Sequence, residues 1–200
     1  IDQRMKVFIS ERLGVGPDEA YRIQKEYLIS HGTTLRGLMD HHNVAPDDFL
    51  DFVHDIDLEP IRPNPGLARC LRRLEGRKYI FTNGTRAHAE AVLERLGLSE
   101  AFDRIFDIRS ADFVPKPAPE AYQRLIKDCG IEPLKAVLVE DMVRNLEPAH
   151  RLGMATVWLN TGSQWGRIGH DEAFVGLEID DLGGWLEGIS REANAVRASQ

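Results

Sequence analysis

The chain has 200 residues, of which 42% are hydrophobic and 28% charged, and its formal net charge is −7. These values are typical of a globular protein with one medium domain, or with one core that carries a smaller unit. The net negative charge argues against binding to a nucleic-acid polymer by bulk electrostatics. No apolar run approaches the roughly 20 residues that span a bilayer, so we expect no membrane partner.

The two cysteines, Cys70 and Cys129, each lie beside apolar neighbours in a helical pattern. We therefore expect two buried thiols and no disulfide bond. Without a disulfide framework or a signal-peptide pattern, the sequence predicts a reducing, cytoplasmic location. It leaves open whether the protein is a monomer or a homodimer.

The first 55 residues show helical periodicity in four consecutive runs. Gly14 and Gly32 end two of these runs, and Pro17 and Pro46 begin two others. Four short helices predict a small antiparallel bundle. We assign residues 1–60 to this helical unit.

Beyond a proline-rich linker at residues 57–66, expected strands alternate with expected helices. The expected strands are 78–82, 104–109, 136–139 and 155–159, and the expected helices are 67–74, 87–96, 120–128, 146–152 and 181–189. This alternation predicts an α/β fold, a Rossmann-like doubly wound parallel sheet, over residues 61–190. The polar residues 191–200 are expected to form a frayed tail.

A hydroxyl and an amide group follow the first expected strand, in Thr82-Asn83-Gly84. Ligands of parallel sheets gather at the carboxyl ends of the strands. The Thr82 hydroxyl and the backbone amides of Asn83 and Gly84 are donors suited to a phosphate group. A simple turn remains the alternative, because Asn-Gly is a common turn dipeptide.

Two adjacent carboxylates, Glu140 and Asp141, follow the apolar strand at 136–139. Such a pair at a buried strand end needs a cation or several hydrogen bonds, and Mg²⁺ fits that need. Alternatively, Asp141 caps the helix that follows. Lys116 lies between two prolines, where it offers a cation to a phosphoryl group or is a solvated loop lysine. Trp165 is expected to pack a loop rather than to stack on a base.

Together, the three stretches resemble the haloacid dehalogenase superfamily of phosphohydrolases. Thr82 matches the phosphate-binding position, Lys116 the lysine motif in its Lys-Pro-x-Pro form, and Glu140-Asp141 the acidic metal-binding pair. The resemblance implies a Rossmann-like core, with the helices before Pro60 as a small α-helical cap that closes over the substrate.

Within that superfamily, the chain most resembles the pyrimidine 5′-nucleotidase group, on residues 27–38, 53–55 and 81–84. The resemblance implies a Mg²⁺-dependent phosphomonoesterase that acts through an aspartyl-phosphate on a small phosphorylated metabolite, a pyrimidine nucleoside 5′-monophosphate. Its implied site residues are Thr82, the Asn83 amide and Lys116 for the phosphoryl group, Asp141 and Glu140 for Mg²⁺, Asn145 for the water shell of the metal, and Arg36 for the substrate.

One motif of the superfamily, Asp-x-Asp-x-Thr, does not occur in these 200 residues. In the family it supplies the nucleophile and the general acid–base. Asp55-x-Asp57 does not replace it, because no apolar strand precedes it. Since the chain enters a helical pattern directly at Ile1, we expect the motif upstream of Ile1 and the given residues alone to be inactive.

Two alternatives to the nucleotidase reading stay open. One is another enzyme of the same fold, such as a sugar-phosphate phosphatase, a phosphosugar mutase or a dehalogenase. The other is a non-catalytic binding protein that has lost its nucleophile. The acidic pair favours the metal-dependent branch over dehalogenation.

Overall fold

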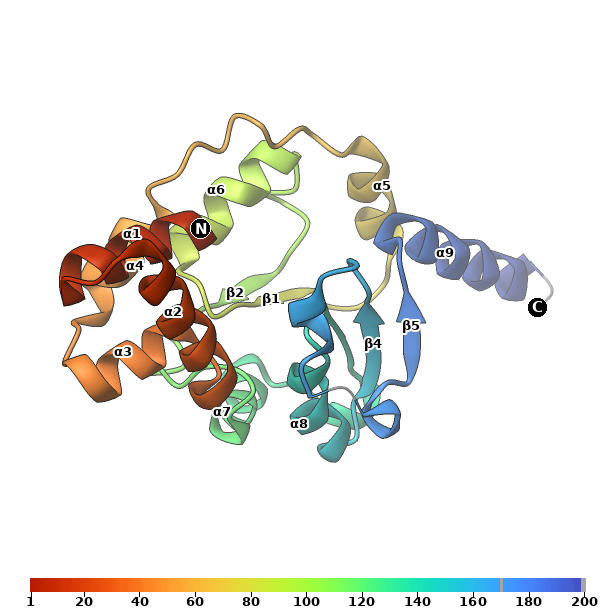
Figure 1. The fold of residues 1–200 in the computed structure, drawn as a ribbon. Helices are drawn as coiled ribbons and strands as arrows, with labels where there is room; N and C mark the ends of the chain where they lie inside the picture. The colour runs from red at the N-terminus through yellow and green to blue at the C-terminus, as the bar shows by residue number, and fades with distance from the viewer. Residues whose placement is uncertain (170, 199–200) are drawn as a thin grey trace.

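The computed structural model describes residues 1–169 and 171–198, and its amino-terminal part is a bundle of helices (Figure 1). The helices of this bundle are α1 Asp2–Leu13, α2 Pro17–His31, α3 Thr34–His42 and α4 Pro46–His54. They agree with the four helical runs of the sequence. Gly14 ends α1 in the left-handed conformation, with φ 66°, which a residue without a β-carbon adopts at little cost.

The bundle encloses its own apolar core. Ile9, Leu38 and Val53 are at most 1% exposed, and the ring of Phe8 packs edge-on against Phe49 at 5.2 Å between centroids. A β-carbon at position 37 would collide with the ring of Tyr27, so the close packing of α2 on α3 requires glycine there. This packing explains the glycine in the sequence Leu35-Arg36-Gly37-Leu38.

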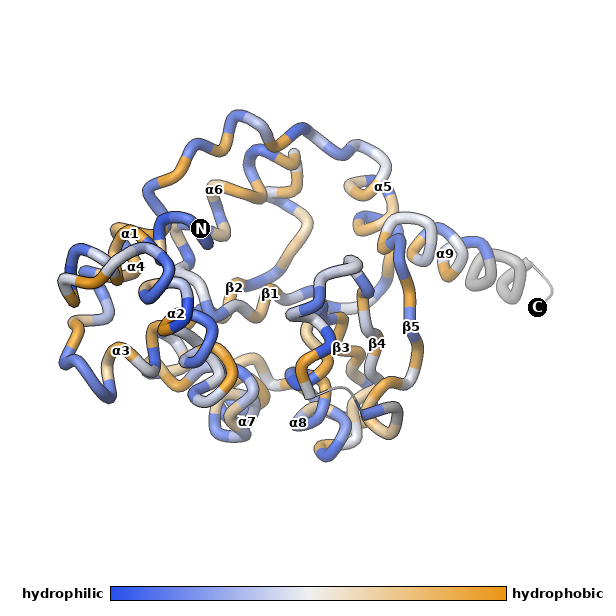
Figure 2. The backbone as a smooth tube through the Cα atoms, viewed as in Figure 1, coloured by the Kyte–Doolittle hydropathy of each residue, from blue (hydrophilic) through white to orange (hydrophobic). Residues whose placement is uncertain are grey.

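An α/β unit follows the bundle (Figure 1). Its helices and strands are α5 Pro65–Arg73, β1 Tyr79–Phe81, α6 Arg86–Leu96, β2 Arg104–Phe106, α7 Pro119–Cys129, β3 Val137–Glu140, α8 Leu146–Arg151, β4 Ala155–Leu159, β5 Leu177–Ile179 and α9 Leu182–Ala198. Short 3₁₀ helices cover Pro133–Lys135, Val143–Asn145, Gln164–Arg167 and Glu172–Phe174. Residues 55–64 connect α4 to α5 without helix or strand, and hydrophilic and hydrophobic residues alternate along them (Figure 2).

All strand pairs are parallel, which confirms the predicted α/β class. The strands form two sheets, β1-β2 and β3-β4-β5, instead of the single sheet that we expected (Figure 1). The physical reason is that no strand of residues 1–169 or 171–198 pairs with both β1 and β3. One edge of β1 and one edge of β3 are therefore without a strand partner in the part of the chain that the structure describes.

The carboxyl end of the chain differs from the sequence-based expectation. Strand β5 was not predicted, because a charged residue, Glu178, interrupts its apolar residues and the strand is largely exposed. Helix α9 continues to Ala198, so residues 191–198 are helical where we expected a frayed tail. Alanines at three of these positions have the highest helix propensity. Residues 199–200 lie outside the described residues.

Two further expectations concern the cysteines and the membrane. Cys70 and Cys129 are both buried and free, as predicted. Within residues 1–169 and 171–198, no helix has both the length and the apolar character to cross a bilayer.

Candidate active site

The Thr82-Asn83-Gly84 stretch forms a tight turn between β1 and α6. The Thr82 hydroxyl oxygen accepts a hydrogen bond from the Gly84 amide at 2.9 Å. Thr85 then caps α6, because its side chain accepts from the His88 amide at 3.2 Å. The turn therefore places the Thr82 hydroxyl beside a helix amino terminus, where the partial positive charge of the helix favours an anion.

The Asn83 side chain connects this turn to the loop that carries Lys116. Its Oδ1 accepts a hydrogen bond from the Lys116 amide at 2.8 Å, and its Nδ2 donates to the Lys116 carbonyl at 3.2 Å. The sequence indicated only the backbone amide of Asn83 as functional. The side-chain contact was not predictable, because its partner lies 33 residues further along the chain.

Lys116 is buried, with 7% of its surface exposed, so it is not a solvated loop lysine. Its Nζ donates to the Phe81 carbonyl at 2.9 Å and to Oε2 of Glu140 at 2.6 Å. Phe81 ends β1 and Glu140 ends β3. A single ammonium group thus bridges the carboxyl ends of the two sheets.

Glu140 is the inner member of the acidic pair, with 8% of its side chain exposed. Its Oε1 accepts from Nδ2 of Asn145 at 3.1 Å. Burial by itself acts to raise the pKa of Glu140, but the Lys116 ammonium and the hydrogen bonds outweigh burial and lower it. Glu140 is therefore an ionised partner of Lys116.

Asp141 is the outer member of the pair and is exposed on its solvent side. Partial desolvation by the surrounding loop, with the adjacent Glu140, raises its pKa to about 6. Its carbonyl oxygen accepts from Nε1 of Trp158 at 3.1 Å, which fixes the loop backbone. The Glu140 carboxylate thus disfavours the charged form of Asp141, and a cation would relieve this repulsion.

The oxygen atoms around this pair can supply part of the coordination shell of a Mg²⁺ ion. Oδ1 of Asn145 is buried and has no hydrogen-bond partner, so an acceptor oxygen is left available on a side chain that is bonded to Glu140. In residues 1–169 and 171–198, no three His, Cys, Asp or Glu side chains gather into a metal site by themselves. Mg²⁺ commonly takes one or two carboxylates and completes its shell with water and phosphate oxygens. The residues present therefore fit an ion of this kind, held mainly by Asp141.

Arg36 lies on α3, where it forms an ion pair with Asp40 at 2.8 Å, four residues along the same helix. Its described polar contacts do not join it to Thr82, Lys116 or Asp141. The structure thus brings together the three predicted stretches and leaves Arg36 outside their hydrogen-bond network.

His54 lies beside the Thr82-Asn83-Gly84 turn. The sequence did not predict this proximity. A β-carbon on Gly84 would lie 3.4 Å from Nε2 of His54 and 3.3 Å from the Thr82 hydroxyl. The ring stacks on His88 at 4.3 Å, and Nδ1 lies 3.2 Å from the Thr85 hydroxyl. Burial, with a smaller effect of His88, lowers the pKa of His54 to about 4. His54 is therefore uncharged at neutral pH.

The family of the chain follows from a comparison with known proteins. A family model of haloacid dehalogenase-like hydrolases matches residues 22–153, about two thirds of the chain. The chain belongs to this family. The matched range contains Thr82, Lys116 and the Glu140-Asp141 pair, so the hydrogen-bonded site lies within the part of the chain that defines the family.

The curated relatives of this chain share about a quarter of its residues over the aligned range. Phosphate metabolism protein 8 of Saccharomyces cerevisiae is 25% identical over 175 residues, which cover 78% of this chain and 54% of the relative. Glyceraldehyde 3-phosphate phosphatase of Pyrococcus furiosus is 27% identical over 143 residues, covering 70% and 59%. The chain thus spans little more than half the length of these curated relatives.

The fold comparison agrees with the family. The crystal structure of a HAD phosphatase from Thermococcus onnurineus superposes with a TM-score of 0.59 at 22% identity, over 94% of this chain and 87% of the other. At this identity, the likeness concerns the fold alone. It supports the α/β architecture with its helical bundle.

Proposed function

We propose that this hydrolase is a Mg²⁺-dependent phosphomonoesterase that forms an aspartyl-phosphate with a small substrate, a pyrimidine nucleoside 5′-monophosphate. The observation that carries the proposal is the Lys116 ammonium, which bridges the ends of β1 and β3 between the Thr82 turn and the acidic pair. A cation held there, next to hydroxyl and amide donors, is suited to the charge of a transferring phosphoryl group.

Each described residue has a defined task in this proposal. The Thr82 hydroxyl and the Asn83 amide orient the phosphoryl oxygens, and Lys116 offsets their charge. Asp141, with Glu140 and Asn145, holds Mg²⁺. When bound, Mg²⁺ supplies further charge neutralisation to the phosphoryl oxygens. Asn83 acts through its side chain as well, because it holds the backbone of Lys116 in position.

The attacking aspartate is proposed to lie upstream of Ile1, on a strand between β1 and β3. Two features support this placement. One edge of β1 and one edge of β3 have no strand partner within residues 1–169 and 171–198. Lys116 already bridges the carboxyl ends of these two strands. A parallel strand between them would end beside the ammonium, where a ligand site is expected in such sheets.

The helical bundle, residues 1–60, is proposed as a cap over the core of residues 61–190. Arg144, in the loop after the acidic pair, donates to the carbonyl groups of Leu28 at 2.6 Å and Gly32 at 2.7 Å. These two hydrogen bonds join the loop that carries the proposed metal ligand to the end of α2. Closure of such a unit would exclude water from the charged site.

The free, buried thiols of Cys70 and Cys129 support a proposed cytoplasmic location, since reducing compartments keep thiols free. A sugar phosphate remains the second substrate class, because one relative carries the name glyceraldehyde 3-phosphate phosphatase.

Phosphate release by the full-length protein tests the proposal. The panel contains uridine and cytidine monophosphates, sugar phosphates and 2-chloropropionate, each with Mg²⁺ and with EDTA. We expect phosphate release with Mg²⁺ only, and the highest kcat/KM for the pyrimidine nucleotides. Halide release without phosphate release would indicate a dehalogenase. No turnover of any compound would favour the non-catalytic alternative.

A further inference from the structure

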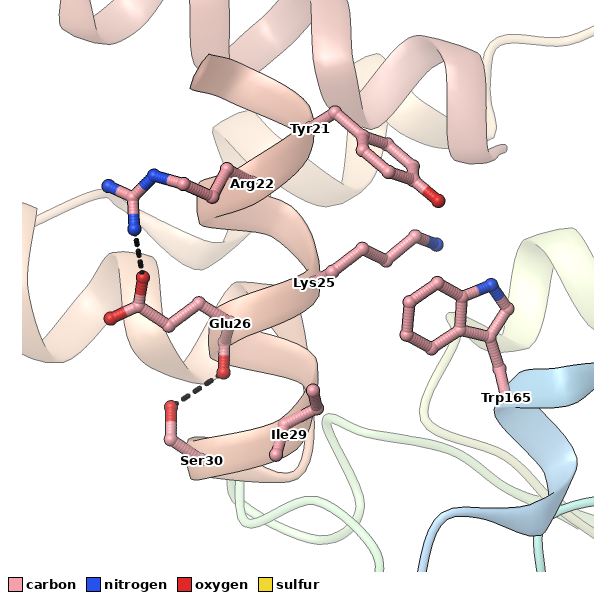
Figure 3. Close-up of a pocket in the computed structure, with 7 residues that line it drawn as sticks. All are labelled: Tyr21, Arg22, Lys25, Glu26, Ile29, Ser30 and Trp165. Carbon is pink, nitrogen blue, oxygen red and sulfur yellow. Dashed lines mark hydrogen bonds and ion pairs between the residues drawn. The ribbon is translucent and has the colours of Figure 1, made fainter. Parts of the chain in front are cut away.

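A pocket of about 510 Å³ lies between α2 and the 3₁₀ helix at Gln164–Arg167 (Figure 3). It is a groove that is largely open to solvent. One wall comes from the helical bundle and the other from the α/β unit. The pocket is not among the features that the sequence pointed to.

The α2 wall is a stripe of residues at helical spacing. Tyr21, Lys25 and Ile29 are four residues apart, so they lie on one face of the helix. Tyr21 is 41% exposed and Ile29 is 56% exposed, so both present apolar surface to the pocket. Trp165 faces this stripe from the other wall (Figure 3). The pocket is thus lined mainly by aromatic and aliphatic groups.

Lys25 is the polar group between the two aromatic rings (Figure 3). Its Nζ lies 4.7 Å from the centroid of the Trp165 ring and 5.3 Å from that of Tyr21. It also donates to Oδ2 of Asp2 at 2.8 Å. An ammonium group has three donor hydrogens, so the bond to Asp2 leaves further donors on Lys25, of which 8% of the surface is exposed.

The charges at the rim are already paired within the protein. Arg22 forms ion pairs of 2.7 Å with both Glu19 and Glu26, and Lys25 pairs with Asp2. The cationic residues that line the pocket, Arg22 and Lys25, are thus both paired with carboxylates, and a further ammonium, that of Lys6, lies 5.7 Å from the centroid of the Tyr21 ring. The chemistry of the pocket suits an uncharged, flat ring that carries a hydrogen-bond acceptor.

Both walls of the pocket contact the loop that follows the acidic pair, one by close packing and the other by hydrogen bonds. Gly166, next to Trp165, packs so closely on Asp141 that a β-carbon would lie 2.7 Å from the Asp141 carbonyl oxygen. On the other wall, Arg144 binds the carbonyl groups of Leu28 and Gly32, at the end of α2. Both walls of the pocket thus contact the loop that begins at Asp141.

We propose that this pocket binds the organic group of the phosphate ester, and that this group is an uncharged heteroaromatic ring with a carbonyl acceptor, as in a pyrimidine base. The ring packs against Trp165 and Tyr21, and Lys25 donates to the carbonyl oxygen. This assignment rests on the proposed phosphatase function and adds the residues that select the substrate. It also replaces the expectation that Trp165 only packs a loop.

The first test compares two esters in the full-length protein: uridine monophosphate, which has the ring, and glycerol phosphate, which lacks it. We expect Trp165→Ala to lower the ratio of their kcat/KM values roughly 10-fold to 100-fold, as expected for the loss of one base–aromatic contact. Trp165→Phe should keep most of this discrimination. Leu177→Ala, which removes an exposed apolar side chain on β5, is the control and should leave the ratio unchanged.

An unchanged ratio in Trp165→Ala, with a thermal midpoint like that of the wild type, would overturn the pocket assignment but not the phosphatase function. If the wild type releases phosphate from neither ester, the proposed function fails. In that case, a titration with uridine tests separately whether the pocket binds a pyrimidine ring. Quenching of tryptophan fluorescence that is lost in Trp165→Phe supports the assignment. Quenching in the 200-residue chain but not in the full-length protein would mean that the upstream segment fills the pocket, which overturns it.

Discussion

Lys116 and Glu140 form a buried ion pair whose chemistry depends on both partners. The side chains are 9% and 8% exposed, and Nζ lies 2.6 Å from Oε2. Charges removed from water are costly, and their attraction offsets this cost only when hydrogen bonds satisfy the remaining atoms. Here the Phe81 carbonyl and the Asn145 amide provide those bonds.

Removal of the lysine alone should therefore destabilise the chain strongly. We expect Lys116→Ala to lower the free energy of unfolding by about 3–5 kcal/mol, because Glu140 is left buried and unpaired. Lys135→Ala is a matched control: its pair with Glu132 has a similar distance, 2.7 Å, but its side chains are 75% and 70% exposed, so we expect a loss below about 1 kcal/mol. Urea denaturation measures both. Equal losses would contradict the buried pair.

His54 should make stability depend on pH. In the unfolded chain an imidazole takes up a proton below about 6.5, whereas the folded chain keeps His54 neutral down to about 4. The stability linked to this group is thus complete above pH 6.5 and is lost as the pH falls toward 4. We expect the thermal midpoint of the wild type to fall more between pH 7 and pH 4.5 than that of His54→Gln. Parallel declines would count against this assignment.

At the scale of elements, the turn after β1 and the loop before α7 act as one unit. Asn83 joins them by two hydrogen bonds to the backbone of Lys116. The position of the ammonium therefore depends on a side chain of the neighbouring turn, as well as on its own loop.

We expect Asn83→Ala to lower the free energy of unfolding by about 1–2 kcal/mol and to speed amide exchange at Lys116, because both hydrogen bonds are lost. Asn160→Ala is the control, since Asn160 also makes two side-chain hydrogen bonds, to Glu178 and Gly162, in an exposed position. Hydrogen exchange measures the difference. Unchanged protection at Lys116 in Asn83→Ala would show that the loop holds itself in place.

The sequence predicted most elements and the three polar stretches, because helix spacing, glycine and proline positions and strand ends are local signals. It did not predict the Asn83–Lys116 contact, the position of His54 beside Gly84, or the pocket of Tyr21 and Trp165. Each of these joins residues far apart in the chain, so no local pattern carries it. The division of the strands into two sheets likewise depends on pairing, which periodicity does not report.

At the scale of the whole molecule, the bundle and the α/β unit share a boundary that the site spans. Ile108 and Phe113, from the segment after β2, pack into the apolar core of the bundle. Arg144, in the loop after the acidic pair, forms hydrogen bonds with the carbonyl groups of Leu28 and Gly32 at the end of α2. The proposed substrate pocket lies between these two units, so a shift of the bundle would alter both the pocket and the access of water to the charged site.

Asp141, together with Lys116 and Thr82, is proposed to form a phosphoryl-transfer site. The deciding measurement is the rate of phosphate release from uridine monophosphate by the full-length Asp141→Asn variant with saturating Mg²⁺. The control variant is Asp180→Asn, which changes an exposed aspartate near the end of β5. We expect Asp141→Asn to lower kcat by roughly 100-fold or more, as for loss of a group that stabilises transition-state charge, and the control to keep the wild-type rate. A wild-type rate in Asp141→Asn would show that Asp141 takes no part in phosphoryl transfer.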